Sequence, residues 1–417
     1  MTDPEAPSPT TPRAEGLPRL DSIDLVRGLV MVVMLLDHVR DFTHSGSFVF
    51  DPLDAARTTP WLYATRWITH LCAPTFVFLA GLSAGLQRLR GKPAEAVARL
   101  LWTRGLWLVF LEVTVVRSLV WFNWHPSMLA HLQVIWAIGC SMIVLAALVR
   151  LPVPAVGGIG VAIALGHNFL DRFQVTPWMG PESPVPSALG KLWIVLHQGG
   201  LFPILGFPSP VVLAHYPVLP WAGVMMAGFG AATAYAWPRE RRRRIFVACG
   251  LAMLAAFFVL RFTNLYGNPT PWAPGADLTR TAMAFFNVSK YPPSALFVLA
   301  TLGLSIPLLG LLDGRPFDRG LGGILVTYGR VPFFFYLLQW VTAHLAGLVV
   351  ALAWGRDLRP LSMNLVQIFS TPDMPPFGGP LWATYLCWAV GTVLLYFPCR
   401  WYAQLKSRRR DWWLSYL

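Results

Sequence analysis

Long apolar segments separated by short polar connections occupy most of the chain. A helix needs about 20 apolar residues to cross the hydrocarbon of a bilayer. Ten such segments follow one another, near residues 23–42, 62–86, 99–120, 128–149, 152–170, 216–237, 244–263, 293–312, 326–352 and 380–403. This pattern predicts an all-α, polytopic integral membrane protein with about ten transmembrane helices.

Two apolar segments are irregular. The ninth is long, and we expect it to be tilted or broken near Pro332, because proline disrupts a helix interior. Residues 190–206 are apolar but rich in glycine, which favours an interfacial or re-entrant piece, although an eleventh span also fits the pattern.

Basic residues mark alternate connections between the predicted spans. The arginines and lysines at 88–99, 150, 239–244, 315–319 and 400–410 all follow even-numbered spans. Basic loops favour the cytoplasmic side, so both termini are predicted to be cytoplasmic. We therefore expect a disordered tail at 1–20, a single transmembrane domain at 21–405 and a basic tail at 406–417. The expected location is a bacterial cytoplasmic (inner) membrane.

Composition excludes several other classes of protein. Hydrophobic residues make up 55% of the chain and charged residues 13%, whereas soluble domains carry about 25% charge. The net charge of +13 is assigned to orienting loops, not to nucleic-acid binding. The five cysteines lie in apolar segments without a CxxC pair, so we interpret them as small buried hydrophobic residues. No P-loop or HExxH motif is present, and we predict no metal site.

Ionisable groups inside membrane spans are costly and are candidates for function. All nine histidines fall at the predicted outer ends of spans or in outer loops, which predicts a polar chamber open to the outer side. They are His38, His44, His70, His125, His131, His167, His197, His215 and His344.

The first span carries the most informative polar pattern. Arg27 and His38 are 11 residues apart, so they face the same way within about 20° and lie about 16 Å apart along a helix. Asp24 and Asp41 extend this face at either end. The face could line a tunnel with an anion-binding inner end and a proton-handling outer end. A simple i,i+3 ion pair between Asp24 and Arg27 is an equally good interpretation.

His38 is the candidate general base, since Asp37 and Asp41 flank it and a carboxylate can orient a histidine. The alternative is a histidine that only packs in the protein interior with a satisfied hydrogen bond and has no catalytic role. Further polar candidates are Arg66 and His70 at i,i+4, Lys290 and Tyr291 before the eighth span, and Arg330, Tyr336 and Gln339 in the ninth. For Arg104 and Glu112, in the third span, a structural ion-pair role is favoured over a catalytic one.

Four stretches of the sequence are similar to one group of membrane enzymes. They are RLDSIDLVRGLVMVVMLLDHVRDFTH at 19–44, RWITHLCAPTFVFLAGLSAG at 66–85, NVSKYPPSALFVLATLG at 287–303 and YGRVPFFFYLLQWVTAHL at 328–345. The chain resembles the heparan-alpha-glucosaminide N-acetyltransferase-like membrane proteins, within the wider group that includes the acyltransferase-3 family. The spacing of Arg27 and His38 matches the arginine-histidine signature of that family.

The resemblance implies acyl transfer across a membrane. Acetyl-CoA (acyl-CoA) on the cytoplasmic side would give its acyl group to a hydroxyl or amine of a sugar-type acceptor on the outer side. Arg27, with Asp24, would meet the phosphates, and Arg330 could be a second inner anion contact. The thioester would pass a channel of small residues that includes Gly81, Ser83, Ala84 and Gly85.

The same resemblance places the proton-accepting step at the outer end of the tunnel. His38, oriented by Asp41 or Asp37, would take the proton of the acceptor. The human-type enzyme aligns an asparagine with His38 and has a histidine in its first outer loop, so His44 is an alternative base. Arg66, His70, His44, Lys290 and Tyr291 are the candidates for binding the acceptor.

Two other kinds of protein remain alternatives at this stage. A proton-coupled secondary transporter could use the same His, Asp and Arg groups as a relay, although the halves of the chain show no convincing inverted repeat. A scaffold that kept only the fold is the second alternative. The bilayer is the expected partner in every case, and a homo-oligomer is possible.

Overall fold

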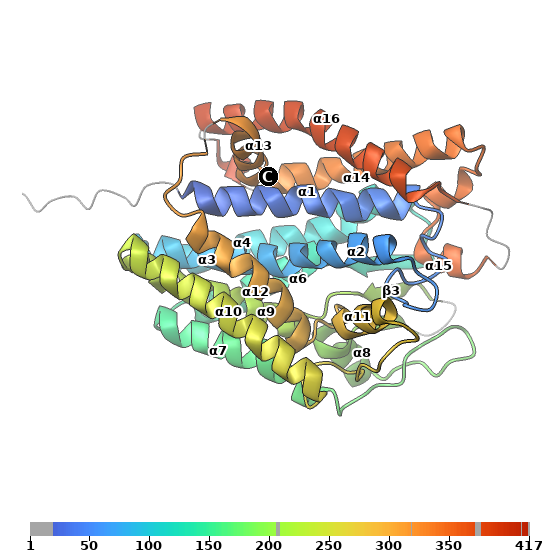
Figure 1. Ribbon diagram of the computed structural model, residues 1–417, viewed down its shortest axis with the longest axis horizontal. Helices are drawn as coiled ribbons and strands as arrows, with labels where there is room; N and C mark the ends of the chain where they lie inside the picture. Colours follow the sequence, from blue (N-terminus) through green and yellow to red (C-terminus); the bar gives the residue numbers. More distant parts are fainter. Residues whose placement is uncertain (1–19, 206–208, 318, 372–376, 410, 416–417) are drawn as a thin grey trace, which may run out of the picture.

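The computed structural model describes residues 20–205, 209–317, 319–371, 377–409 and 411–415. Figure 1 shows a bundle whose longer helices run roughly along one common direction, with α1 near its middle. The helices are α1 (Asp21–Thr43), α2 (Pro60–Ile68), α3 (Cys72–Leu89), α4 (Ala94–Leu111), α5 (Arg117–Trp121), α6 (Val134–Leu148), α7 (Val153–Gly166), α8 (Ala188–Trp193), α9 (Val218–Ala231), α10 (Arg239–Thr263), α11 (Leu278–Phe286), α12 (Ala295–Leu311), α13 (Gly320–Arg330), α14 (Pro332–Ala353), α15 (Leu365–Phe369) and α16 (Leu381–Arg408).

Within the described ranges, six helical segments are long and apolar enough to cross a membrane. They are Pro60–Leu89, Val153–Leu170, Val218–Ala236, Arg239–Thr263, Pro332–Ala353 and Leu381–Arg408. The other predicted spans correspond to α1 and α4, which carry several charges, and to α6 and α12, which are shorter. The outward faces of α10 and α16 expose large apolar side chains, including Val259, Phe262, Leu394 and Phe397, as lipid-facing helices do.

The ninth predicted span is broken, as its proline predicted. It consists of α13 and α14, which meet at Val331 and Pro332. Because proline has no amide hydrogen, it is well tolerated at the start of α14, whereas it would interrupt a continuous helix. Near the C-terminus, α16 continues to Arg408. It therefore passes residue 405, the predicted boundary between the transmembrane domain and the basic tail.

The structure is mostly helical, consistent with the expected all-α membrane protein, and adds one small sheet at one end of the bundle. Residues 128–132, predicted to start the fourth span, form strand β1 (Met128–Leu132). The segment at 190–206 holds α8, a π-helical turn and strand β2 (Gly200–Pro203). Strand β3 (Val211–Ala214) lies between the two, parallel to β1 and antiparallel to β2.

The two ends of the bundle differ in character. The sheet, α2, α8, α11 and α15 gather at the right in Figure 1, and we call this the sheet end. The opposite end is where α1 starts, α3 finishes at Leu89, and α10 begins with the arginines 239 and 241–244. We call it the basic end. The cysteines are free, and Cys249 is exposed whereas Cys72 and Cys399 are buried, so burial does not hold for all five.

Helix α1 packs against α3, α13, α14 and α16. Its approach to α13 is very close: a Cβ atom placed on Gly329 would lie 1.8 Å from the carbonyl oxygen of Asp24. A Cβ atom on Gly28 would lie 1.8 Å from the carbonyl oxygen of Leu325. Small residues allow helix backbones to approach in this way inside membrane proteins, so both glycines are required by the packing of α1.

Substitution Gly329→Ala is predicted to push α13 away from α1. We expect a loss of about 1–3 kcal/mol of stability, the usual cost of overpacking, measured by denaturant titration of the detergent-purified protein. The control is Gly158→Ala in α7, where an added Cβ atom meets nothing within 4 Å. An equal loss in both variants would contradict the packing argument.

Candidate functional site

A cavity of about 350 Å³ opens between α1, α3, α4, α6 and α14. Its lining is mostly apolar and includes Met31, Met34, Phe76 and Leu101. Four basic side chains also line it, namely Arg27, Arg104, Arg330 and Lys406. Since Arg27 lies near the start of α1 and Lys406 near the finish of α16, the basic side chains include groups from the basic end. The cavity therefore combines a cationic part with apolar walls.

Arg27 is held in place by three segments of the chain. Its guanidinium donates to Asp24 Oδ1, to the carbonyl oxygen of Gly329 and to Ser83 Oγ, each at 3.1 Å. The expected ion pair with Asp24 is present. Arg27 and Ser83 also line the cavity, so the ion pair leaves the arginine facing this space. Arg330, another cavity residue, pairs with Asp21 at 3.3 Å.

The predicted polar face of α1 follows the cavity toward the sheet end. Arg27, Met31 and Met34 line the cavity, and His38 is the next position on the same face. On α14, Tyr336 lines the cavity, and Trp340 follows one turn later. The rings of His38 and Trp340 stack with centroids 3.8 Å apart, so this pair stands one turn beyond the cavity lining.

His38 is half-buried, and its Nδ1 atom is buried without a hydrogen-bond partner among the described residues. The expected orientation by a carboxylate is therefore not seen at that atom. Asp37 and Asp41 instead bind arginines. The stacked Trp340 ring is the contact that positions the imidazole.

The small-residue channel is present only in part. Ser83 and Ala84 line the cavity. Gly81 and Gly85 face α9 instead, because a Cβ atom on either glycine would lie within 2.3 Å of a carbonyl oxygen of that helix, at Met225 and Phe229. These two glycines serve the packing of α3 on α9, and the expectation that they line the channel is wrong.

A second polar group surrounds Asp37, and we call it the Asp37 cluster. The two carboxylate oxygens of Asp37 accept from Arg66 Nη1 at 2.8 and 2.7 Å. Arg40 lies 3.0 Å and the Lys290 ammonium 4.0 Å from the same carboxylate. Arg40 also pairs with Asp41 at 2.6 Å. The cluster thus has three cations and two carboxylates.

Further polar rings adjoin this cluster from the sheet end. His70 is 1% exposed, and neither ring nitrogen has a partner among the described residues. Tyr291 lies under the Lys290 ammonium at 5.2 Å and against the His215 ring at 3.8 Å. The structure therefore brings four of the predicted acceptor-binding residues to one region, namely Arg66, His70, Lys290 and Tyr291.

Two buried imidazoles near the sheet, those of His131 and His215, contact each other. His131 Nε2 and His215 Nδ1 are 3.0 Å apart, so one ring donates and the other accepts. Burial lowers the pKa of His131 to about 3. Burial, and then the neighbouring His131, hold the pKa of His215 well below its usual value.

His44 lies apart from the cluster. It follows α1, and its Nδ1 atom accepts from the Gly46 amide at 3.0 Å. Burial and then Arg40 lower the pKa of His44. The Nδ1 lone pair thus stabilises the local turn, and only Nε2 is left to carry a proton.

The structure also assigns contacts that the sequence did not predict. Glu112 is fully buried in a π-helical turn, and its Oε2 atom accepts from the Trp136 amide at 2.9 Å. It therefore satisfies the first turn of α6, a position that favours negative charge. Arg104 and Lys406 line the cavity, a role that the sequence analysis did not give them.

A comparison with known protein families finds one match. A family model described as "Heparan-alpha-glucosaminide N-acetyltransferase, catalytic" matches residues 19–263. The first two of the four similar stretches lie inside that match, and the stretches at 287–303 and 328–345 lie beyond it. No curated protein matches the chain.

Substitution Asp37→Asn is predicted to destabilise the protein. It leaves Arg66, Arg40 and Lys290 with one carboxylate fewer, and removing one partner of a buried ion pair costs about 3–5 kcal/mol. Denaturant titration measures the change. The control is Glu95→Gln, whose exposed pair with Arg150 spans 3.5 Å and contributes little to stability because water screens it. Equal effects would show that the Asp37 cluster is not electrostatically important.

Proposed function

The chain belongs to the heparan-alpha-glucosaminide N-acetyltransferase family, and on that premise we propose the reaction that its two polar sites support. It moves an acetyl group from acetyl-CoA at the basic end to a hydroxyl or amine of a sugar-type acceptor at the sheet end. One observation carries the proposal: the cavity with basic side chains and the Asp37 cluster lie on successive turns of α1, and His38 is next to Asp37, one turn beyond the cavity residue Met34.

The cavity suits the donor. Acyl-CoA has phosphates at one end and a narrow thioester arm at the other. Arginine and lysine bind phosphate by charge-assisted hydrogen bonds, and the apolar walls suit the arm. A neighbouring hollow of about 510 Å³ shares Arg330 and Lys406 with the cavity and adds Arg400 and Tyr396. It can receive the nucleotide part of the donor.

His38 is the proposed general base. It removes the proton of the acceptor hydroxyl or amine, whose lone pair attacks the thioester carbonyl. The carbon–sulfur bond then breaks, CoA leaves as the thiolate, and the proton on His38 neutralises it. Trp340 fixes the ring, and Asp37 and Asp41, held by arginines, supply negative charge near the imidazolium. The engaged Nδ1 atom of His44 makes that residue the weaker alternative.

The Asp37 cluster and its neighbours are the proposed acceptor site. Arg66, Lys290 and Tyr291 offer donors there, and neither ring nitrogen of His70 has a partner in the part of the chain that the structure describes. Hydrogen-bonding groups of both kinds suit a saccharide. The basic end is proposed to face the cytoplasm of a bacterium, following the positive-inside rule, with ten spans and both termini on that side.

Substitution His38→Ala is predicted to lower acetyl transfer by about 10²–10⁴-fold, the usual contribution of a general base. Affinity for CoA should be retained, because His38 lies beyond the cavity lining. Steady-state assays with candidate amino sugars measure the rate, and calorimetry measures donor binding. The control is His125→Ala, an exposed histidine. Near-normal turnover of the His38 variant would remove the residue from the mechanism.

Substitution Arg27→Ala is predicted to weaken CoA binding by at least about tenfold, since one charge-assisted hydrogen bond contributes about 1.5–3 kcal/mol. Calorimetry on purified protein makes the comparison, with Arg150→Ala as the control for an exposed arginine. A wild-type protein that binds no CoA, yet moves substrate in vesicles with a proton gradient, would instead establish the transporter alternative.

A further inference from the structure

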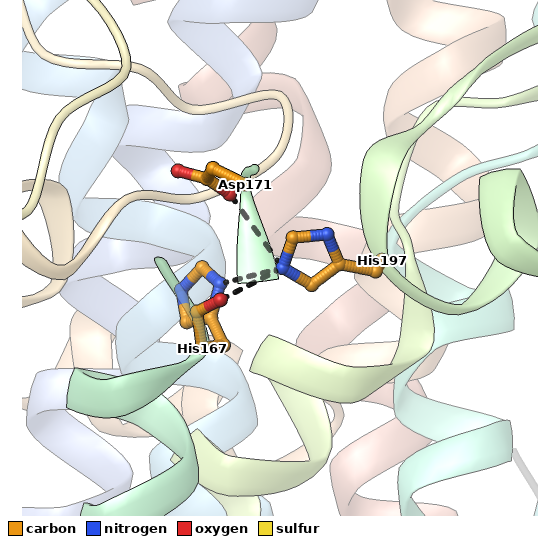
Figure 2. A group of neighbouring side chains, drawn as sticks. All are labelled: His167, Asp171 and His197. Atoms are coloured by element: carbon orange, nitrogen blue, oxygen red, sulfur yellow. Dashed lines mark hydrogen bonds and ion pairs between the residues drawn. The ribbon is translucent and has the colours of Figure 1, made fainter. Parts of the chain in front are cut away.

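A group of metal-binding side chains lies at the sheet end, outside the cavity and the Asp37 cluster. His167 and Asp171 lie at the end of the α7 segment, in and just after its last 3-10 turn. His197 belongs to the π-helical turn (Ile194–Gln198) that follows α8. Figure 2 shows the three side chains around one point, with His197 facing the other two. His197 is 1% exposed and His167 3%.

The distances in this group match those around a small metal ion. His167 Nδ1 and His197 Nε2 are 3.4 Å apart, and His197 Nε2 and Asp171 Oδ1 are 3.6 Å apart. The three ligand atoms all lie within 4.8 Å of one another. A tetrahedral zinc ion with bonds of about 2.0–2.2 Å separates its ligand atoms by about 3.3–3.6 Å. Only small side-chain movements are needed to admit the ion.

Neighbouring contacts hold two of the ligands in position. The Asn168 side chain donates through Nδ2 to the second carboxylate oxygen of Asp171 at 2.7 Å. Its Oδ1 atom accepts from the Ala295 backbone amide at 2.7 Å. Trp193 stacks on the His197 ring with centroids 4.8 Å apart. Such outer contacts are a regular feature of metal sites, because they orient the ligands.

We propose that His167, Asp171 and His197 bind a divalent transition metal of the zinc class. Two imidazoles and one carboxylate form a donor set for zinc or iron(II), whereas magnesium and calcium prefer oxygen ligands alone. His197 Nε2 lies 3.0 Å from the His167 carbonyl oxygen, a distance at which it can donate a hydrogen bond. Metal binding places the proton on Nδ1 and leaves the Nε2 lone pair for the ion. Water completes the coordination.

The metal joins two parts of the sheet end. His167 and Asp171 follow α7, and His197 immediately precedes β2. Through Asn168 the site also contacts the first turn of α12, just after the segment that carries Lys290 and Tyr291. Bound metal therefore fixes the connection between α7 and the sheet. This inference does not depend on the acetyltransferase reaction.

The test is metal analysis of the intact protein, purified in detergent through a tag without histidine. After incubation with zinc and gel filtration, mass spectrometry of the elements should find about one zinc per chain, as in a single three-ligand site. His197→Ala should lower zinc affinity by more than about 100-fold, since even outer-contact changes cost about 10–100-fold. Iron bound in place of zinc, and lost in the same variant, also supports the site.

Two further variants keep the result interpretable. Asp171→Asn preserves side-chain size but removes the charge, and should also lose metal if His197→Ala fails to fold. His125→Ala changes an exposed histidine and should retain it. Cobalt(II) should give the strong visible absorption of a tetrahedral site in wild-type and His125→Ala protein, but not in Asp171→Asn. Equal metal content in wild type and Asp171→Asn, or equal loss in the His125 control, would overturn the proposal.

Discussion

The need to pair charges inside an apolar bundle governs the packing around α1. Arg27 lies within a helix that otherwise presents long apolar stretches, and an unpaired charge there is costly. Its partners come from α1 itself, from Ser83 on α3 and from the carbonyl oxygen of Gly329 on α13. The Gly329 carbonyl is within reach because α13 approaches α1 without an intervening side chain. The close glycine contact and the fixed arginine are thus one feature of the structure.

The same constraint acts again ten residues later, at Asp37, with a different outcome. Asp37 binds Arg66 and lies near Lys290, so it joins α1 to α2 and to the segment before α12. The arginines bind both carboxylates, so the His38 ring lies beside Trp340 with no partner for its Nδ1 atom within the described ranges. A histidine that is fixed by stacking, and not consumed by a carboxylate, keeps its nitrogens available for proton transfer.

Helical periodicity predicted the local features of the site but not the contacts between distant segments. The common face of Arg27 and His38, the Asp24–Arg27 pair and the break before Pro332 depend on residues close in sequence. The orientation of Gly81 depends on where α9 lies, which the sequence pattern cannot show. Short apolar strands such as β3 cannot be told from helical segments by periodicity alone. The group of His167, Asp171 and His197 joins segments 26 residues apart through their folding, so no spacing motif revealed it.

The position of His38 relative to the two polar sites bears on the kind of chemistry that the fold supports. Arg27, Met31 and Met34 lead along one face to His38, and Asp37 is its immediate neighbour. The Asp37 cluster begins about one helical turn beyond the cavity lining on α1, and one turn is about 5.4 Å. A thioester in the cavity and an acceptor at the cluster would therefore be close enough to react. A transporter must carry the whole substrate past the His38–Trp340 pair. In the proposed group transfer two substrates need only meet, and the stacked His38–Trp340 pair is the proposed meeting point.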